Sequence, residues 1–165
     1  MTDVIVESGI PFVAENVFHI ENTAAYKNLG SGIKSVEFVR RKNEVLVFVE
    51  AKTTFPNPNN SETKFNIASA DIADKFIHSL NLFASIILGL YTDDISATDN
   101  LSSKSTTITF ILVIREHMTE WCEQVKDKLT LLLNDCTYFR EIWRPKVYVI
   151  NYATAVKFGL AETTG

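Results

Sequence analysis

Alternation of apolar and polar positions is clearest between residues 33 and 54. The segments 33–40 and 44–54 are rich in β-branched and aromatic residues, and they flank the polar turn Arg41-Lys42-Asn43. Such runs on both sides of a polar turn are typical of an antiparallel β-hairpin. The pattern predicts that the two segments pair with each other.

Two later segments carry apolar residues at three- and four-residue steps, the spacing of one helix face. The first predicts a helix over 64–91 that packs on a sheet through Phe65, Ile72, Phe76, Leu80, Phe83, Ile87 and Leu90. The second predicts a helix over 118–135 with Trp121, Cys122, Val125, Leu129 and Leu132 facing inward. Asn60 or Ser61 is a suitable N-cap for the first helix.

The other segments complete a mixed α/β pattern. Residues 106–115 are apolar at most positions, which predicts a central strand covered on both faces. Pro145 precedes a further strand over 146–152, followed by a short helix, while 4–13 suggests a short strand and 14–29 a weakly amphipathic helix. The polar stretches 55–63 and 92–105 are short enough to be loops within one domain. We expect a single domain with a mixed sheet flanked by helices.

Composition narrows the class of protein. The chain has 165 residues, 46% hydrophobic and 22% charged, which is ordinary for a globular domain. A net charge of -4 argues against a protein that binds by neutralising many phosphates, although a metal-dependent enzyme acting on nucleic acid remains allowed. The N-terminus shows no basic leader, and no apolar run reaches the ~20 residues of a membrane span. The two cysteines lie in or beside one predicted helix, and we expect them to be reduced thiols. These features predict a cytoplasmic protein without a membrane segment.

Candidate chemistry lies at the end of the second hairpin strand. The side-chain period of two places Glu50 and Lys52 on the same face as the apolar Leu46 and Phe48. Because the other face is apolar as well, a carboxylate and an ammonium emerge where both faces are covered, and that position requires a reason.

A second carboxylate is expected nearby. If the turn is centred on Lys42-Asn43, Glu37 lies opposite Phe48 and on the same face as Glu50, about 7–8 Å away along the diagonal. Two carboxylates and a lysine suit phosphodiester hydrolysis, because carboxylate oxygens bind Mg²⁺ and a cation stabilises developing charge.

The segments Glu37-Phe38-Val39 and Val47-Phe48-Val49-Glu50-Ala51-Lys52 resemble the core of the PD-(D/E)XK, or restriction-endonuclease-like, superfamily. The usual Pro-Asp is Val36-Glu37 here. The resemblance implies a restriction-endonuclease-like fold and a nuclease that cleaves DNA or RNA with Mg²⁺ or Mn²⁺. It also implies metal binding by Glu37 and Glu50, with Lys52 in catalysis. Helix carboxylates upstream sometimes join such a site, which adds Glu21, or else Glu15, as a further metal ligand.

Other interpretations stay open. Glu50 and Lys52 could form a simple salt bridge, and the chain could be an inactive relative that kept the fold. It could also be a non-catalytic subunit or inhibitor in a bacterial or phage defence system, binding a protein through the loop Phe55–Asn60 with Phe55 exposed. A homodimer is compatible with either function. The basic turn Arg40-Arg41-Lys42 is most simply a solvated hairpin tip. No His pair, acyl-transfer motif or Gly-rich phosphate loop points to other chemistry.

Overall fold

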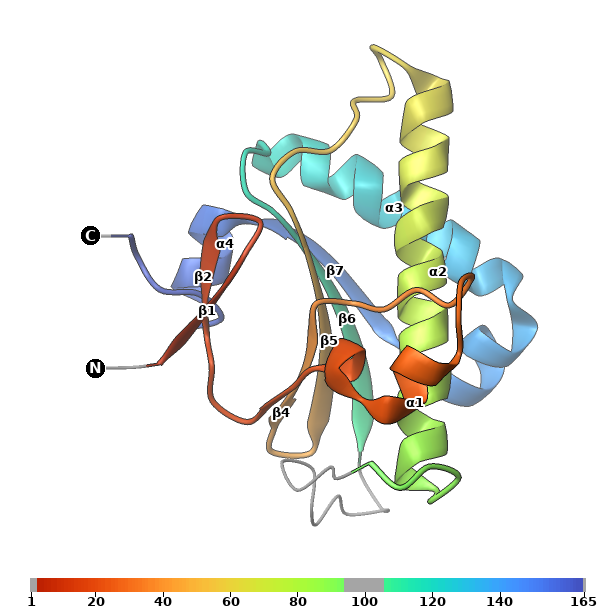
Figure 1. The fold of residues 1–165 in the computed structure, drawn as a ribbon. Helices are drawn as coiled ribbons and strands as arrows, with labels where there is room; N and C mark the ends of the chain where they lie inside the picture. Colours follow the sequence, from red (N-terminus) through yellow and green to blue (C-terminus); the bar gives the residue numbers. More distant parts are fainter. Residues whose placement is uncertain (1–2, 94–105, 165) are drawn as a thin grey trace.

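A computed structural model describes residues 3–93 and 106–164, and the described chain is a mixed α/β structure (Figure 1). The strands are β1 (Val4–Glu7), β2 (Ile10–Val13), β3 (Val17–Phe18), β4 (Phe38–Lys42), β5 (Val45–Lys52), β6 (Thr107–Ile114) and β7 (Lys146–Asn151). The helices are α1 (Ala24–Asn28), α2 (Glu62–Ile87), α3 (Thr119–Asp135) and α4 (Tyr152–Lys157), with short helical turns at Ile20–Asn22 and Phe139–Trp143.

The central sheet has five strands in the order β3-β4-β5-β6-β7. Strand β4 is antiparallel to β3 and β5, whereas β5, β6 and β7 are parallel to one another. Parallel neighbours need long crossover connections, and α2 and α3 are those connections. The predicted fold class, a mixed sheet flanked by helices, is therefore confirmed.

Two apolar cores lie on the two faces of this sheet. Helices α2 and α3 cover one face, and the β1-β2 hairpin with α4 covers part of the other (Figure 1). On the α2 face, Phe76 stacks on Phe110 with ring centroids 4.6 Å apart, and Phe110 meets Phe48 edge-on at 5.6 Å. All three rings are fully buried, and burial of such a side chain contributes about 1.5–3 kcal/mol. These contacts fix α2 against β5 and β6.

Helix α2 begins where its cap predicts. The Ser61 side chain accepts a hydrogen bond from the backbone N–H of Lys64, which satisfies one of the free donors of the first turn. The predicted apolar face is largely correct, but its end is not. Ile87 and Leu90 are exposed, and Ile86 is buried in place of Ile87. No helix of the described residues is both long enough and apolar enough to cross a membrane.

The N-terminal predictions were only partly correct. Residues 4–13 form a hairpin rather than one strand, because Ser8 and Gly9 adopt positive φ angles and reverse the chain. The helix predicted over 14–29 is wrong over most of its length, since it contains β3, a short turn and only the five-residue α1. Local apolar spacing there was weak, and pairing with β4 overrode it.

The central hairpin is confirmed, but its register is displaced from the predicted one. Lys42 pairs with Val45, so the turn residues are Asn43 and Glu44, and residues 33–37 precede the strand instead of forming it. Asn43 has φ of 54°, a left-handed conformation that asparagine tolerates in tight turns. Of the loop predicted over 92–105, residues 94–105 lie outside the described residues.

Candidate functional site

Glu50 lies near the carboxyl end of β5 on the face covered by α2. The carboxylate is completely buried, with no exposed side-chain area, in a strand whose two faces are both covered. One oxygen, Oε2, has no hydrogen-bond partner among the described residues. A buried, half-satisfied carboxylate is costly, and such groups are often found where a ligand or a reaction needs them.

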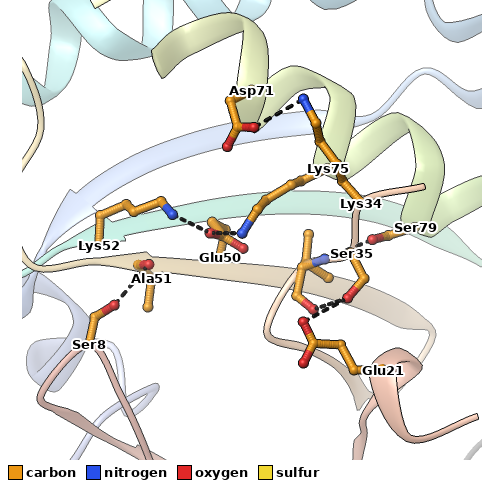
Figure 2. A network of polar contacts seen from close by, with 11 residues as sticks. Ser8, Glu21, Lys34, Ser35, Glu50, Ala51, Lys52, Asp71, Lys75 and Ser79 are labelled. Carbon is orange, nitrogen blue, oxygen red and sulfur yellow. Dashed lines mark hydrogen bonds and ion pairs between the residues drawn. The ribbon is translucent and has the colours of Figure 1, made fainter. Parts of the chain in front are cut away.

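Two ammonium groups converge on the other oxygen of Glu50 (Figure 2). Lys75 on α2 donates to Oε1 at 2.6 Å, and Lys52, two residues along β5, lies 3.1 Å from the same atom. The Lys75 side chain is 19% exposed and that of Lys52 35%. Glu50 is therefore held from both sides, and we call Glu50, Lys52 and Lys75 the buried cluster.

Sequence reasoning missed Lys75. Its position three residues after Ile72 and one before Phe76, two core residues of α2, was the available signal. A lysine directly beside the buried stripe of a helix can extend its ammonium along the sheet surface. Which strand residue that ammonium meets depends on how α2 lies on the sheet.

Glu37 is brought to the same site by the segment that precedes β4. Phe38, the first residue of β4, pairs with Val49, and Glu37 directly precedes it, so its charge acts on Glu50. The preceding residues are anchored to α2, since the Val36 backbone N–H donates to Ser79 Oγ at 2.9 Å. Glu37 is half-buried.

The electrostatics of the two carboxylates agree with this proximity. Burial raises the pKa of Glu50, Lys75 and Lys52 lower it in part, and the Glu37 carboxylate raises it further. Burial also raises the pKa of Glu37, and the neighbouring Glu7 carboxylate adds to that rise. Burial opposes the charge on Lys75, but the carboxylates of Glu50 and Glu37 outweigh burial and raise its pKa. The Lys75 ammonium therefore stays charged. A further cation beside Glu37 and Glu50 would favour the charged form of both carboxylates.

The other predicted metal ligands, Glu21 and Glu15, are both exposed. Glu21 is exposed and accepts a hydrogen bond from Ser35 Oγ at 3.2 Å (Figure 2), and its charge raises the pKa of Glu37. Glu15 is exposed in the segment between β2 and β3. Across residues 3–93 and 106–164, no three His, Cys, Asp or Glu side chains are grouped closely enough to hold a metal ion. A cation here would therefore depend on Glu37 and Glu50, with water or substrate completing its ligands.

The loop after β5 differs from what the interaction hypothesis required. Phe55 is 8% exposed and packs edge-on against Phe65 in the first turn of α2, so it is a core residue and the prediction of an exposed Phe55 was wrong. Its apolar ring packs under the loop, and the polar Asn60 is exposed instead.

That loop borders a groove of about 450 Å³ just beyond Lys52. Asn57, Asn60 and Lys64 line one side, and His117 and Trp121 line the other. Burial lowers the pKa of His117, whose ring meets Trp121 edge-on at 5.3 Å. The groove combines an aromatic ring, amides, the Lys64 ammonium and the Glu116 carboxylate next to the carboxyl end of β5.

Both cysteines are free thiols, as predicted. Burial, with the nearby Glu123 and Glu120 carboxylates, raises the pKa of Cys122 to about 11, so that thiol is a poor nucleophile.

Comparison of the chain with protein-family models, with curated proteins and with solved structures gave no match in any of the three.

Proposed function

We propose that the chain is a divalent-metal-dependent nuclease that hydrolyses phosphodiesters of DNA or RNA at the buried cluster and Glu37. The observation that carries the proposal is Glu50: its carboxylate is fully buried, one oxygen holds two lysines and the other oxygen has no partner among the described residues. A salt bridge needed only for stability has no use for the open oxygen.

The donor set fits Mg²⁺ or Mn²⁺ in part. Mg²⁺ commonly uses one or two protein carboxylates and completes its coordination with water and substrate phosphates. Glu50 Oε2 and Glu37 would hold the ion, and Glu21 is too exposed to be more than an outer contributor. When bound, the ion supplies Lewis-acid activation and a water of lowered pKa.

Each lysine then has a separate role. Lys75 fixes the orientation of Glu50 through the short bond to Oε1. Lys52 is the more exposed of the two, and its ammonium is placed to stabilise charge that develops on a phosphate. The groove beyond Lys52 offers Trp121 and Lys64 for the nucleotide next to the scissile bond.

The order of the sheet also supports the resemblance to the PD-(D/E)XK superfamily. That resemblance expects an acidic residue on the second strand and the E-x-K pair on the third. In the five-stranded sheet, Glu37 immediately precedes the second strand, β4, and Glu50 and Lys52 end the third, β5.

The test is divalent-dependent cleavage of single- and double-stranded DNA and RNA, beside a thermal shift with Mg²⁺ and Mn²⁺. Glu50→Gln should lose both the metal-dependent shift and cleavage. Lys52→Ala should lose cleavage by about 10²–10⁴-fold while keeping the shift, because it removes a cation and no ligand. Lys157→Ala, which removes an exposed lysine on α4, is the matched control and should behave as wild type.

A wild-type protein that neither binds the ions nor cuts any substrate would refute the nuclease. The non-catalytic subunit or inhibitor would then be the better hypothesis, with the buried cluster as a structural salt bridge.

A further inference from the structure

The face of the sheet opposite α2 and α3 is only partly covered. Beside the β1-β2 hairpin and α4 it leaves a groove of about 390 Å³, within the size range of small-molecule sites. Its lining includes Arg40, Lys42, Val47, Ile111, Tyr148 and Phe158.

The floor of this groove is apolar and formed by regular sheet. Arg40 pairs with Val47 across β4 and β5, and Ile111 pairs with Tyr148 across β6 and β7. Directly paired residues point to the same side of a sheet, so these side chains share the face away from α2. Val47 and Ile111 are half-buried.

Two aromatic rings border the floor. Tyr148 is 45% exposed and Phe158 66%. Phe158 ends α4 and is followed by Gly159 with φ of 69°. The N–H groups of Leu160 and Gly159 donate to the carbonyls of Ala155 and Val156, a Schellman ending that sets the direction of the chain at Phe158. A large apolar ring is thus presented to solvent by a rigid backbone.

The groove has a positive rim on a protein with a net charge of -4. The lining contains Arg40 and Lys42 and no described acidic residue. Neither side chain forms a hydrogen bond or ion pair with another described residue, although Arg40 is half-buried. An unpaired guanidinium beside apolar surface favours an anionic ligand.

From this geometry we propose a second binding site, for a free nucleoside monophosphate, on the face of the sheet opposite Glu50. The base stacks on Tyr148 and Phe158 over Val47 and Ile111, and the phosphate lies on Arg40 and Lys42. Such a site needs no Gly-rich loop, so motif analysis does not detect it. A second copy of the chain fits less well, because a symmetric contact would bring the same basic side chains into one interface.

The experiment measures binding of adenosine 5′-monophosphate by calorimetry and NMR, in chelator and in the Glu50→Gln background. Binding there does not depend on the proposed nuclease, so failure of one proposal is distinguishable from failure of the other. Phe158→Ala, Tyr148→Ala and Arg40→Gln should each weaken binding about ten-fold. Tyr138→Ala, which removes an equally exposed tyrosine (43%) elsewhere, is the control and should not.

Three further arms define the ligand. Adenosine alone and inorganic phosphate alone should each bind at least ten-fold more weakly than the nucleotide, because each uses half of the groove. A deoxyadenosine hexanucleotide that binds more tightly than the nucleotide would overturn the assignment to a free ligand. No binding at millimolar concentration, binding unchanged in the three variants, or dimerisation that Phe158→Ala abolishes would each overturn the site.

Discussion

Helix α2 contributes to two clusters of opposite charges, which have the same chemistry in different surroundings. In the exposed cluster, Lys34 lies 3.0 Å from Asp71 and 2.9 Å from Asp74, and all three side chains are more than a third exposed. In the buried cluster, Glu50 is fully buried between Lys52 and Lys75. In the exposed cluster one lysine pairs with two carboxylates, whereas in the buried cluster two lysines pair with one carboxylate.

The difference in burial decides what each cluster can do. Asp74 and Asp71 raise the pKa of Lys34, but solvent screens this attraction, and exposed pairs contribute only about 0–1 kcal/mol. The exposed cluster ties the segment before β4 to α2. In the buried cluster burial raises the pKa of Glu50 despite two neighbouring ammonium groups. A charge kept where its environment disfavours it is better explained by function than by stability.

Removal of Lys75 should have the largest effect. Lys75→Met leaves the Glu50 carboxylate buried with one partner, and loss of one member of a buried pair typically costs about 3–5 kcal/mol. Urea denaturation at pH 8 measures this loss in the free energy of unfolding. The loss should be smaller at pH 5, because Glu50 can then take up a proton. If the proposed cation site exists, Mg²⁺ should restore part of the loss. A cost below about 1 kcal/mol would mean that the two clusters do not differ.

Glu50→Gln should act in the opposite direction. Glutamine has the same shape as glutamate but buries no charge. In the presence of a chelator we therefore expect the free energy of unfolding of Glu50→Gln to exceed that of wild type by about 1 kcal/mol, or roughly 2–4 °C in Tm. Differential scanning calorimetry of both proteins is the measurement. A fall in Tm of several degrees would show that the buried cluster is an ordinary stabilising salt bridge.

The pH dependence of stability should follow the two raised carboxyl pKa values. Between the ordinary value of 4.5 and the raised values of Glu37 and Glu50, the folded chain binds more protons than the unfolded chain. The free energy of unfolding contributed by this pair therefore falls as the pH rises through that window and recovers on acidification. Denaturation in chelator from pH 4.5 to 8 should show it. The free energy of unfolding of the Glu37→Gln/Glu50→Gln variant should rise relative to that of wild type as the pH rises. Parallel stability curves for the two proteins would contradict the assignment of raised pKa values to these two carboxyl groups.

The smallest effect is expected at the exposed cluster. Lys34→Met should cost about 0–1 kcal/mol, and 1 M NaCl should remove most of the difference because screening is then effective within about 3 Å. The same salt should leave the Lys75→Met difference largely intact. Equal salt sensitivity of the two variants would end the distinction between the clusters.

Much of the fold could be predicted from local patterns. The β4-β5 hairpin, the position of β6 between two strands, and helices α2 and α3 all follow from apolar spacing. Burial agrees with most of the predicted inward positions, but Ile87, Leu90 and Trp121 are exposed. Prediction failed where the local signal was weak or ambiguous. The apolar residues of region 14–29 follow no clear helical or strand period, and its two-residue strand exists only because β4 lies beside it.

For the candidate site, the sequence by itself determined that Glu50 and Lys52 share one face of a strand covered on both sides, because a strand alternates with a period of two. The parity of the hairpin predicted Glu37 on that face. The observed register has the same parity but begins at Phe38, so Glu37 lies just outside the pairing.

Only the tertiary structure decided that Lys75 reaches Glu50, because a helix residue and a strand residue meet through the packing of α2 on the sheet. Packing likewise buried Phe55 beneath its own loop, and it left the opposite face open between Arg40 and Phe158. Contacts of this kind depend on how separate elements pack together, and no periodicity within one element encodes them.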